Sequence, residues 1–561
     1  MISGIDAQGA LSYARRAMAY FRTKTVKNKG KTYRYLQLVE SNRVEGRVVQ
    51  TVLASLGRLE DLQADGGVDR LAMSLARYTE KVMVLDALQD GSVVADDCRQ
   101  WGPALVFDRM WKKLGLGRIV RELAGKREFQ FDVERVVFAM ALQRLVRAQT
   151  GSDRDGCHWL QEVRIDGLTD GTADVEPALQ HFYRAVGFLD DAKETIEERL
   201  WFEGRDLFNR QVDIALFDTT SLYFEGEGPK GLAARGKSKD GRYDCTQVVL
   251  GVVLTQDGWP LCFETWPGNT TDVTTVVPML DKLRNRFDIR RVVFVADRGM
   301  TSKANLQAIE DAGFDYIVGC KLRGDKEVRD TVLSRAGTYR TVADNLRVKQ
   351  VEVEGRRYVV CHNPIEEEHD RFKREAIVER LRENLVGKSP KKAMPHRGYK
   401  RFLSVTGATV RLDEAAIKKD ARYDGKYVLR TSTDWATQDV AAAYRSLWQV
   451  EHFFRDFKTP LNARPIYHRN AKQVRGHLMG CFLGMVLATA LRRALDELGE
   501  DAKGVEWHRL MRDLRRIQAI DMTLGDRRYL VRSELEGKAW LAFRAAGIKP
   551  PPRVTPLPPH V

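Results

Sequence analysis

The stretch YRSLWQVEHFFRDFK, residues 444–458, predicts the helix around which the rest of the chain is organised. With about 3.6 residues per turn, its apolar residues form one stripe that can pack on a core, namely Leu447, Val450, Phe454, Phe457 and Leu461. A second stripe lies about a quarter turn away and consists of Tyr444, Trp448, Glu451, Arg455 and Lys458. Glu451 would then stand at the edge of the core on a rigid element, where it can bind a metal or act as a general base. The alternative is an amphipathic helix with an ion-paired glutamate.

Two short apolar runs earlier in the chain each end in an aspartate. VDIALFD ends at Asp218 and RRVVFVAD ends at Asp297, and both runs are typical of buried strands. If the two strands are neighbours, their carboxylates meet at one edge of a sheet, where ligands bind in such folds. The alternative for each is a turn or helix-cap aspartate; the helix expected after Asp297 has Ser302 as a further candidate cap. Together with Glu451, the two aspartates suit Mg²⁺ and two-metal phosphoryl transfer.

The charge of the chain favours a polyanionic partner, most simply nucleic acid. Lys and Arg number 92 and Asp and Glu 77, which gives a net charge of +15. Basic loops occur at 230–242 and 388–401, and the second is either a DNA contact or a solvated surface. The glycines of GEGPKG at 226–231 lack the phosphate-binding G-x-x-x-x-G-K-[ST] pattern, which argues against a nucleotide loop of that type.

Cysteine usage and hydropathy bear on the compartment. The seven cysteines are scattered singly without a CxxC pair, which argues against a disulfide framework or a zinc site and fits a reducing cytoplasm. The longest apolar stretch, LMGCFLGMVLATAL at 478–491, is too short to span a bilayer and predicts a buried core helix. We therefore expect no membrane partner.

The 561 residues suggest three or four domains, and the changes of pattern along the chain divide it into six regions. We predict an N-terminal β-rich module at 1–65, a helical domain at 66–205 that is a candidate for DNA-end binding, a first part of an α/β core at 206–320, a β-rich insertion at 321–430, a second part of the core with the Glu451 helix at 431–500, and a C-terminal helical region with a disordered Pro-rich tail at 501–561.

These motifs together resemble a DDE transposase of bacterial insertion sequences. More narrowly, Tyr444, Glu451 and Lys458 match the spacing of the Tyr-x2-Arg-x3-Glu-x6-Lys signature of the insertion sequence four-like branch, and Leu447 stands where that signature has arginine. The resemblance extends over most of 210–490, where it is carried by LFDTTSLYFE, GKSKDGRYDCTQVVLG, PGNTTD, VVFVADRGM and RPIYHRNAKQVRGHLMGCFLG.

The resemblance implies a multidomain α/β protein with a ribonuclease-H-like core that is interrupted by a β-rich insertion. It implies that Asp218, Asp297 and Glu451 are catalytic and bind two Mg²⁺ ions, with Mn²⁺ able to substitute. The implied substrates are the double-stranded transposon ends and target DNA, and the implied reaction is cut-and-paste movement through a hairpin end. The enzyme would act as a homodimer in a synaptic complex, in the cytoplasm and associated with the nucleoid. From the resemblance and from charge, we expect DNA contacts at Tyr444, Lys458, Arg455, Trp448, Lys237, Lys239, Arg242, Lys391, Lys392, Arg397 and Arg298.

Two other functions remain open at this point. One is a ribonuclease-H-like nuclease that cleaves DNA without strand transfer, and the other is a transposase-derived DNA-binding protein without catalysis. The presence of Asp218, Asp297 and Glu451 weighs against the second.

Overall fold

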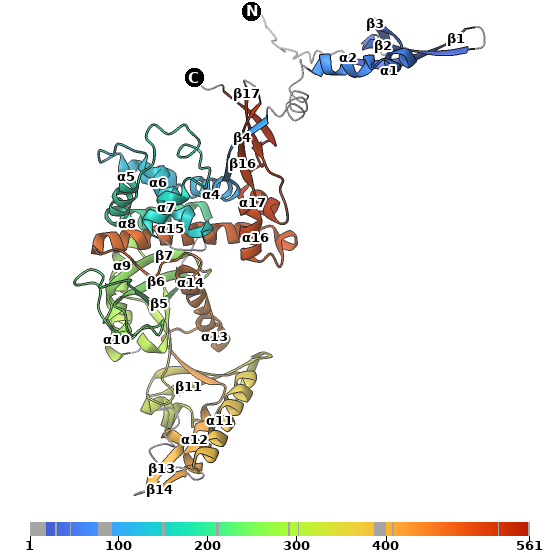
Figure 1. The fold of residues 1–561 in the computed structure, drawn as a ribbon. Coiled ribbons are helices and arrows are strands. Elements are labelled where there is room, and N and C mark those ends of the chain that lie inside the picture. The colour runs from blue at the N-terminus through green and yellow to red at the C-terminus, as the bar shows by residue number, and fades with distance from the viewer. Residues whose placement is uncertain are drawn as a thin grey trace, which may run out of the picture. The chain divides into compact units, whose positions relative to one another are not determined.

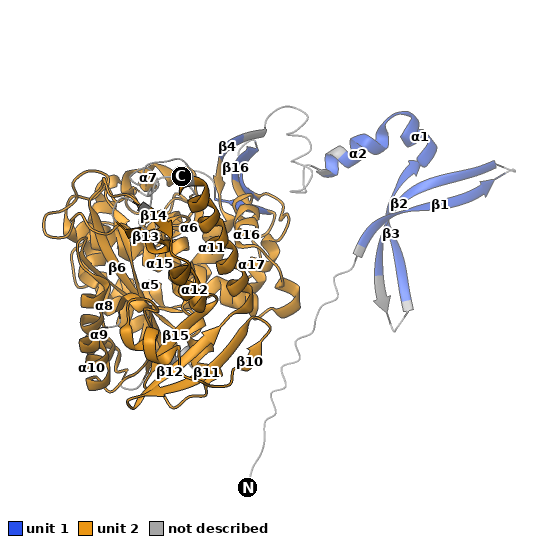
Figure 2. Cartoon of the chain, turned by 90° about the horizontal axis from the view of Figure 1, so that it is seen from below, with its two compact units in different colours: residues 1–97, 520–531, 554–561 blue, residues 98–519, 532–553 orange. Residues whose placement is uncertain are grey.

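The computed structural model describes residues 18–28, 31–44, 47–76, 93–147, 152–208, 213–289, 292–300, 302–385, 400–406, 409–524 and 527–558. The chain divides into two compact units (Figure 2). Unit 1 comprises residues 1–97, 520–531 and 554–561, and unit 2 comprises residues 98–519 and 532–553.

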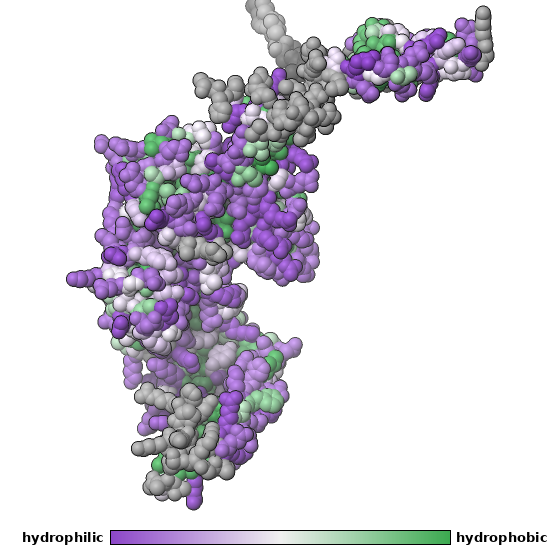
Figure 3. Space-filling model, viewed as in Figure 1, coloured by the Kyte–Doolittle hydropathy of each residue, from purple (hydrophilic) through white to green (hydrophobic). Residues whose placement is uncertain are grey.

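Unit 1 contains the β-rich module that the N-terminal sequence predicts. β1 (Met18–Asn28), β2 (Lys31–Val44) and β3 (Arg47–Arg58) form an antiparallel sheet in that order. Two helices follow, α1 (Leu59–Ala64) and α2 (Gly67–Ala76). Apolar side chains of β3 such as Val49 and Leu53 are exposed, and Figure 3 shows apolar surface on this part of the chain.

The C-terminal region contains strands that the sequence did not predict. A four-stranded sheet has the order β18–β17–β16–β4, formed by β4 (Val93–Gln100), β16 (Gln518–Leu524), β17 (Arg527–Arg532) and β18 (Val554–Leu557). β18 belongs to the Pro-rich tail, which was expected to be extended and disordered. It is extended, but it pairs antiparallel with β17, so the prediction of disorder is wrong for these residues. The helices of this region are α16 (Trp507–Arg515) and α17 (Ala539–Ala546).

A helical body precedes the main sheet of unit 2. Its elements are α4 (Gly102–Lys113), α5 (Leu116–Ala124), α6 (Val133–Val146), α7 (Asp153–Trp159) and α8 (Leu179–Phe208). The apolar stretch 478–491 lies in α15 (Ala471–Asp496), which packs against α6 and α8. By length and composition α15 could cross a membrane, but most of its apolar window is buried inside the protein, as predicted for a core helix.

The main sheet of unit 2 has nine strands in the order β10–β11–β12–β15–β9–β8–β5–β6–β7. Its central part is formed by β5 (Ile214–Tyr223), β6 (Gln247–Thr255), β7 (Pro260–Pro267), β8 (Val293–Ala296) and β9 (Asp315–Gly319). β5, β6 and β7 are antiparallel neighbours, whereas β5, β8 and β9 run parallel. Every residue of β6 is buried, which explains its continuous apolar sequence.

Alternate residues of β5 face two separate cores. Ala215 and Phe217 pack with α9 (Val276–Phe287) and α10 (Lys303–Asp311), whereas Leu216 and Leu222 belong to the core that includes α14 (Trp448–Lys458) and α15. Figure 1 shows α9 and α10 on one side of β5–β7 and α14 on the other. This alternation follows from the two-residue period of a strand.

The predicted β-rich insertion continues the main sheet. Its strands β10 (Arg340–Ala343), β11 (Leu346–Val353) and β12 (Arg356–His362) join β9 through β15 (Lys426–Thr431), all in antiparallel pairs. The remaining elements are α11 (Pro364–Leu385), the hairpin of β13 (Leu403–Thr406) and β14 (Thr409–Leu412), and α12 (Glu414–Asp420). β10, β11, β12 and β15 therefore extend the sheet that carries Asp218, whereas β13 and β14 form a separate two-stranded sheet.

The single helix predicted over residues 444–458 is in fact two helices. α13 (Thr437–Arg445) ends before Ser446, and α14 (Trp448–Lys458) begins after Leu447. At the junction the amide of Leu447 donates to the carbonyl of Tyr444, and that of Val450 to the carbonyl of Leu447, both at three-residue spacing. This tighter turn divides the predicted helix, although Tyr444, Trp448 and Glu451 of the predicted stripe still line one pocket.

Candidate active site

Asp218 lies within β5 and not at its end, contrary to the sequence prediction. The strand continues to Tyr223 because the residues after Asp218 are β-branched and apolar. β5 and β8 are neighbours, as predicted, and the last pair of their parallel register is Phe217 with Ala296. The next residue on each is an aspartate, so the register sets the positions of Asp218 and Asp297 side by side.

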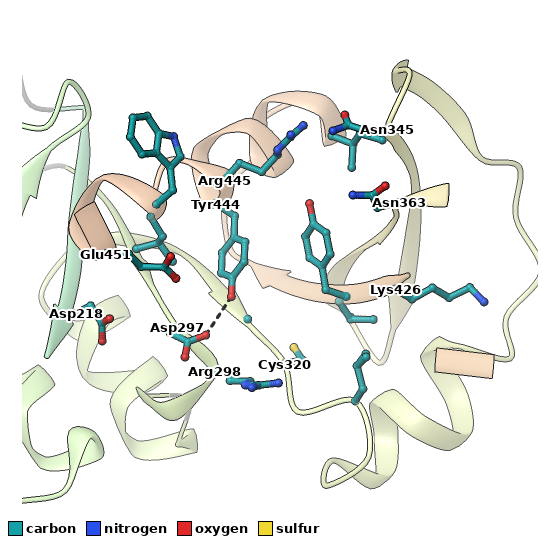
Figure 4. A pocket seen from close by; sticks show the side chains of 17 residues that line it. Asp218, Asp297, Arg298, Cys320, Asn345, Asn363, Lys426, Tyr444, Arg445 and Glu451 are labelled. Carbon is teal, nitrogen blue, oxygen red and sulfur yellow. Dashed lines mark hydrogen bonds between the residues drawn. The ribbon is translucent and has the colours of Figure 1, made fainter. Parts of the chain in front are cut away.

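Asp297 directly follows β8 and precedes a short 3-10 turn, η2 (Arg298–Met300). Its Oδ1 accepts a hydrogen bond from the Tyr444 hydroxyl at 3.2 Å (Figure 4). The cap of α10 is Ser302, whose Oγ accepts from the amide of Asn305 at 3.0 Å. The carboxylate of Asp297 is therefore not the cap of α10 and stays within the pocket described below.

Glu451 is an exposed residue of α14, whose other face is buried. The buried side chains are Val450, Phe453, Phe454 and Phe457. This confirms the predicted apolar stripe for three of its members, with Leu461 also buried beyond the helix. Leu447 departs from it: this residue is half-buried in the turn before α14, where it packs against the core and lines the pocket.

One pocket of about 510 Å³ brings the three predicted carboxylates together. Asp218, Asp297 and Glu451 all line it, and they lie on the same side in Figure 4. The other side in that view carries Asn345, Asn363 and Lys426. Trp448 also lines the pocket, and its side chain is 53% exposed. The pocket therefore combines carboxylate oxygens, which can bind a metal ion, with an accessible aromatic ring.

The electrostatics of Asp218 reflect burial and neighbouring charge. Burial raises the pKa of Asp218 to about 6, and the carboxylates of Asp297 and Asp272 add to the rise, whereas the Lys239 ammonium and the Thr219 amide oppose it. Burial and the adjacent Asp297 also raise the pKa of Tyr444, so this phenol stays protonated and donates to Asp297. Negative charge is thus concentrated here, which a bound cation would relieve.

A second pocket, of about 760 Å³, shares Asp297 and Arg298 with the first, and its lining includes five cationic side chains. They are Lys237, Lys239, Arg298, Lys321 and Arg323, against the carboxylates Asp272 and Asp297. Lys237, Arg298 and Lys321 are exposed. A phosphate group that approaches Asp297 through this second pocket meets more positive than negative side chains.

The residues predicted on α14 have different environments. Arg455 is exposed and donates to His452, whose ring also contacts Trp448 edge-on. Lys458 is instead largely buried, with its side chain 10% exposed, and its Nζ lies 2.8 Å from Asp240 Oδ1. Lys458 thus forms an internal ion pair in this structure, and a phosphate contact at this residue stays a prediction.

The residues predicted in the basic loops also differ. Lys237 is exposed, whereas Lys239 reaches toward Asp218 and Asp272 at 3.7 and 3.6 Å. Arg242 is paired with Asp244 at 2.8 Å and lies over the ring of Tyr223. The remaining three predicted DNA contacts lie outside the described residues: Lys391, Lys392 and Arg397.

The sequence prediction missed Asp272 as a member of the site. Asp272 begins η1 (Asp272–Thr275), and its Oδ1 accepts from the Thr219 hydroxyl at 2.5 Å. The motif PGNTTD carries part of the family resemblance, but nothing in its spacing predicts that its aspartate contacts the residue after Asp218. Lys321 and Lys426 were missed because they follow β9 and begin β15, strands that gave no functional signal.

The donor set has the chemistry that Mg²⁺ prefers, since carboxylate oxygens are hard ligands. Within the described part of the chain, no three His, Cys, Asp or Glu side chains converge closely enough to form a metal cluster. Asp218, Asp297 and Glu451 thus line one pocket without forming a closed ligand set.

Two protein-family models match the chain. Residues 211–487 match the transposase DDE domain, and residues 21–88 match the N-terminal domain of the IS1634 family transposases. No curated protein matches the chain. Among solved structures, the piggyBac transposase synaptic complex with hairpin DNA is similar at 12% identity and a TM-score of 0.35, over 74% of this chain and 79% of that one.

The matched domain defines the class of the protein, a transposase of the DDE type. The chain belongs to the DDE transposases of bacterial insertion sequences, and the resemblance found in the sequence is confirmed at this level.

Proposed function

We propose that this transposase cleaves DNA at the ends of its insertion sequence and joins the freed ends to target DNA, with Asp218, Asp297 and Glu451 as the catalytic, metal-binding residues. The observation that carries the proposal is the parallel register of β5 and β8, which sets Asp218 beside Asp297 in a pocket that Glu451 also lines. The transposase DDE domain that matches residues 211–487 supports the same assignment.

The fold that we propose for residues 214–319 together with α14 is ribonuclease-H-like. The strand order β7–β6–β5–β8–β9 supports it, with three antiparallel strands followed by two that run parallel to β5. In this arrangement the centre of the sheet supplies two carboxylates and a packed helix supplies the third. β15, β12, β11 and β10 extend the sheet beyond β9, and β15 adds Lys426 to the pocket.

The proposed cofactor is Mg²⁺, as two ions, with Mn²⁺ able to substitute. Asp218, Asp297 and Glu451 would hold the ions, which activate the attacking oxygen and stabilise the leaving oxygen when bound. The raised pKa of Asp218 supports a cation site, because burial and neighbouring carboxylates disfavour its ionised form until positive charge is supplied. Tyr444 orients Asp297 through its hydroxyl.

The DNA substrate is proposed to lie across both pockets. Lys237, Lys239 and Arg298 line the basic pocket, which suits phosphate groups. Exposed Trp448 offers a face for a base, and Arg455 lies one α14 turn beyond Glu451. By family resemblance we also propose a hairpin intermediate, cut-and-paste movement, a synaptic homodimer and action at the nucleoid in the cytoplasm.

A cleavage assay on DNA that carries the element's terminal inverted repeats tests the proposal. We expect strand cleavage at the element end that requires Mg²⁺ and stops with a chelator, and a joined product when target DNA is added. Cleavage without joining would identify a nuclease without strand transfer. DNA binding without cleavage would identify a catalytically silent protein and overturn the proposal.

A further inference from the structure

The loop between β5 and β6 carries two adjacent charged residues that contact different elements. The Lys239 Nζ donates to the Thr219 carbonyl at 2.6 Å and to its hydroxyl at 3.0 Å, on β5. Asp240 instead faces the end of α14, with Oδ1 at 2.8 Å from Lys458 Nζ and Oδ2 at 3.1 Å from Arg464 Nε. Residues 239 and 240 therefore connect the strand of Asp218 to the helix of Glu451.

The ion pair with Lys458 is shielded from water. The side chains of Lys458 and Asp240 are 10% and 11% exposed. A charge that is largely removed from water depends on its partner, because either charge left alone would carry the full desolvation cost. The position of Asp240 is therefore coupled strongly to that of Lys458.

The backbone around these residues is fixed by specific contacts. The amide of Lys239 donates to Ser221 Oγ at 2.8 Å. The buried Ser238 accepts from the amides of Asp240 and Arg242 at 3.2 and 3.0 Å. A Cβ at Gly236 would lie 2.1 Å from the Gly268 carbonyl oxygen, so the loop packs tightly against the end of β7. The loop is thus held in place by hydrogen bonds and packing, and it is not only a solvated basic segment.

We propose that Asp240 is a positioning residue that couples α14 to β5. Held by Lys458 and Arg464, it fixes the loop so that the Lys239 ammonium stays at Thr219 and near the carboxylates of Asp218 and Asp272. Lys458 then acts through Asp240 and does not bind a DNA phosphate directly. The inference rests on the proposed function and adds Asp240 and Arg464 to the residues that set the geometry of the site.

The test is a double-mutant cycle in the full-length protein with Asp240→Asn and Lys458→Met. Asparagine keeps the shape of Asp240 and removes its charge. We expect each change to slow single-turnover cleavage at least about tenfold, the double variant to be no slower than either single one, and DNA-end affinity to stay unchanged. Lys458→Arg, which keeps the charge, restores most of the rate. Glu227→Gln, an exposed acidic residue of the same loop, is the control and keeps the parental rate.

A direct phosphate contact at Lys458 would give a different result. Lys458→Met would then weaken DNA-end binding, Asp240→Asn would free Lys458 and leave binding intact or tighter, and the two effects would be independent. That outcome overturns the inference while the parent still cleaves, so the proposed function survives it.

A second measurement does not depend on activity. Limited trypsin digestion of the loop at 230–242 is expected to accelerate in Asp240→Asn and in Lys458→Met and to stay at the parental rate in Glu227→Gln. Unchanged digestion in Asp240→Asn and Lys458→Met overturns the inference, whether or not the parent cleaves DNA. Absence of cleavage by the parent is a different result, which refutes the proposed function itself.

Discussion

Replacing Gly319 with alanine is expected to push Tyr444 away from Asp297. Gly319 ends β9 and is not among the glycines with positive φ, so alanine adds no backbone strain. A Cβ would however lie 2.4 Å from the Tyr444 hydroxyl oxygen and 3.1 Å from its Cζ. The phenol must move by about 1 Å to restore an ordinary contact distance, and overpacking of this kind costs about 1–3 kcal/mol of unfolding free energy.

A matched background separates this clash from other effects of the alanine. In Tyr444→Phe the hydroxyl oxygen is absent, so the penalty of Gly319→Ala is expected to fall by about 1 kcal/mol or more. Denaturant unfolding of the parent, the two single variants and the double variant measures the coupling. Equal penalties for Gly319→Ala in both backgrounds would refute the packing of Tyr444 over Gly319 and, with it, the role of Tyr444 in orienting Asp297.

Three further changes have defined outcomes. Burial raises the pKa of Asp218 to about 6, so the metal-free folded protein holds a proton that the unfolded chain loses near pH 4, and this group makes the free energy of unfolding fall by up to about 3 kcal/mol as pH rises from about 4 to 6. In Asp218→Asn we expect this fall to disappear from denaturant midpoints measured with a chelator. The same pH slope in the variant and the parent would contradict the raised pKa of Asp218. Leu447→Arg is expected to lower the free energy of unfolding by less than about 2 kcal/mol and to tighten DNA-end binding, because Leu447 is half-buried at the pocket. A larger loss of stability in a thermal melt would place Leu447 in the core. Replacing Lys237 and Lys321 together with alanine should lower the slope of log K against log salt by up to about 2, and an unchanged slope would remove the basic pocket from the DNA path.

Local pattern predicted much of the site because each carboxylate lies on an element with a strong signal. The buried segments that precede Asp218 and Asp297 are continuous apolar runs, and α14 has a clear apolar stripe that leaves Glu451 outside the core. The parallel pairing of β5 with β8 required only that two predicted strands be neighbours. These features depend on residue type and spacing within short windows.

What the sequence could not predict depends on contacts between distant residues. The break between α13 and α14 has no Gly or Pro to mark it, and periodicity continues across it. The burial of Lys458 depends on Asp240, which lies 218 residues earlier in the chain. The pairing of β18 with β17 overrides the tendency of a Pro-rich segment to stay unstructured.

The measurement that tests the central claim most directly is Mg²⁺-dependent cleavage of an element end by Asp218→Asn, Asp297→Asn and Glu451→Gln. Asp311→Asn, an exposed aspartate on α10, serves as the control. We expect each of the three variants to fold and bind DNA but to lose cleavage at every Mg²⁺ concentration, while the control cleaves like the parent. Near-parental cleavage by any of the three would contradict the assignment of that carboxylate to the metal site.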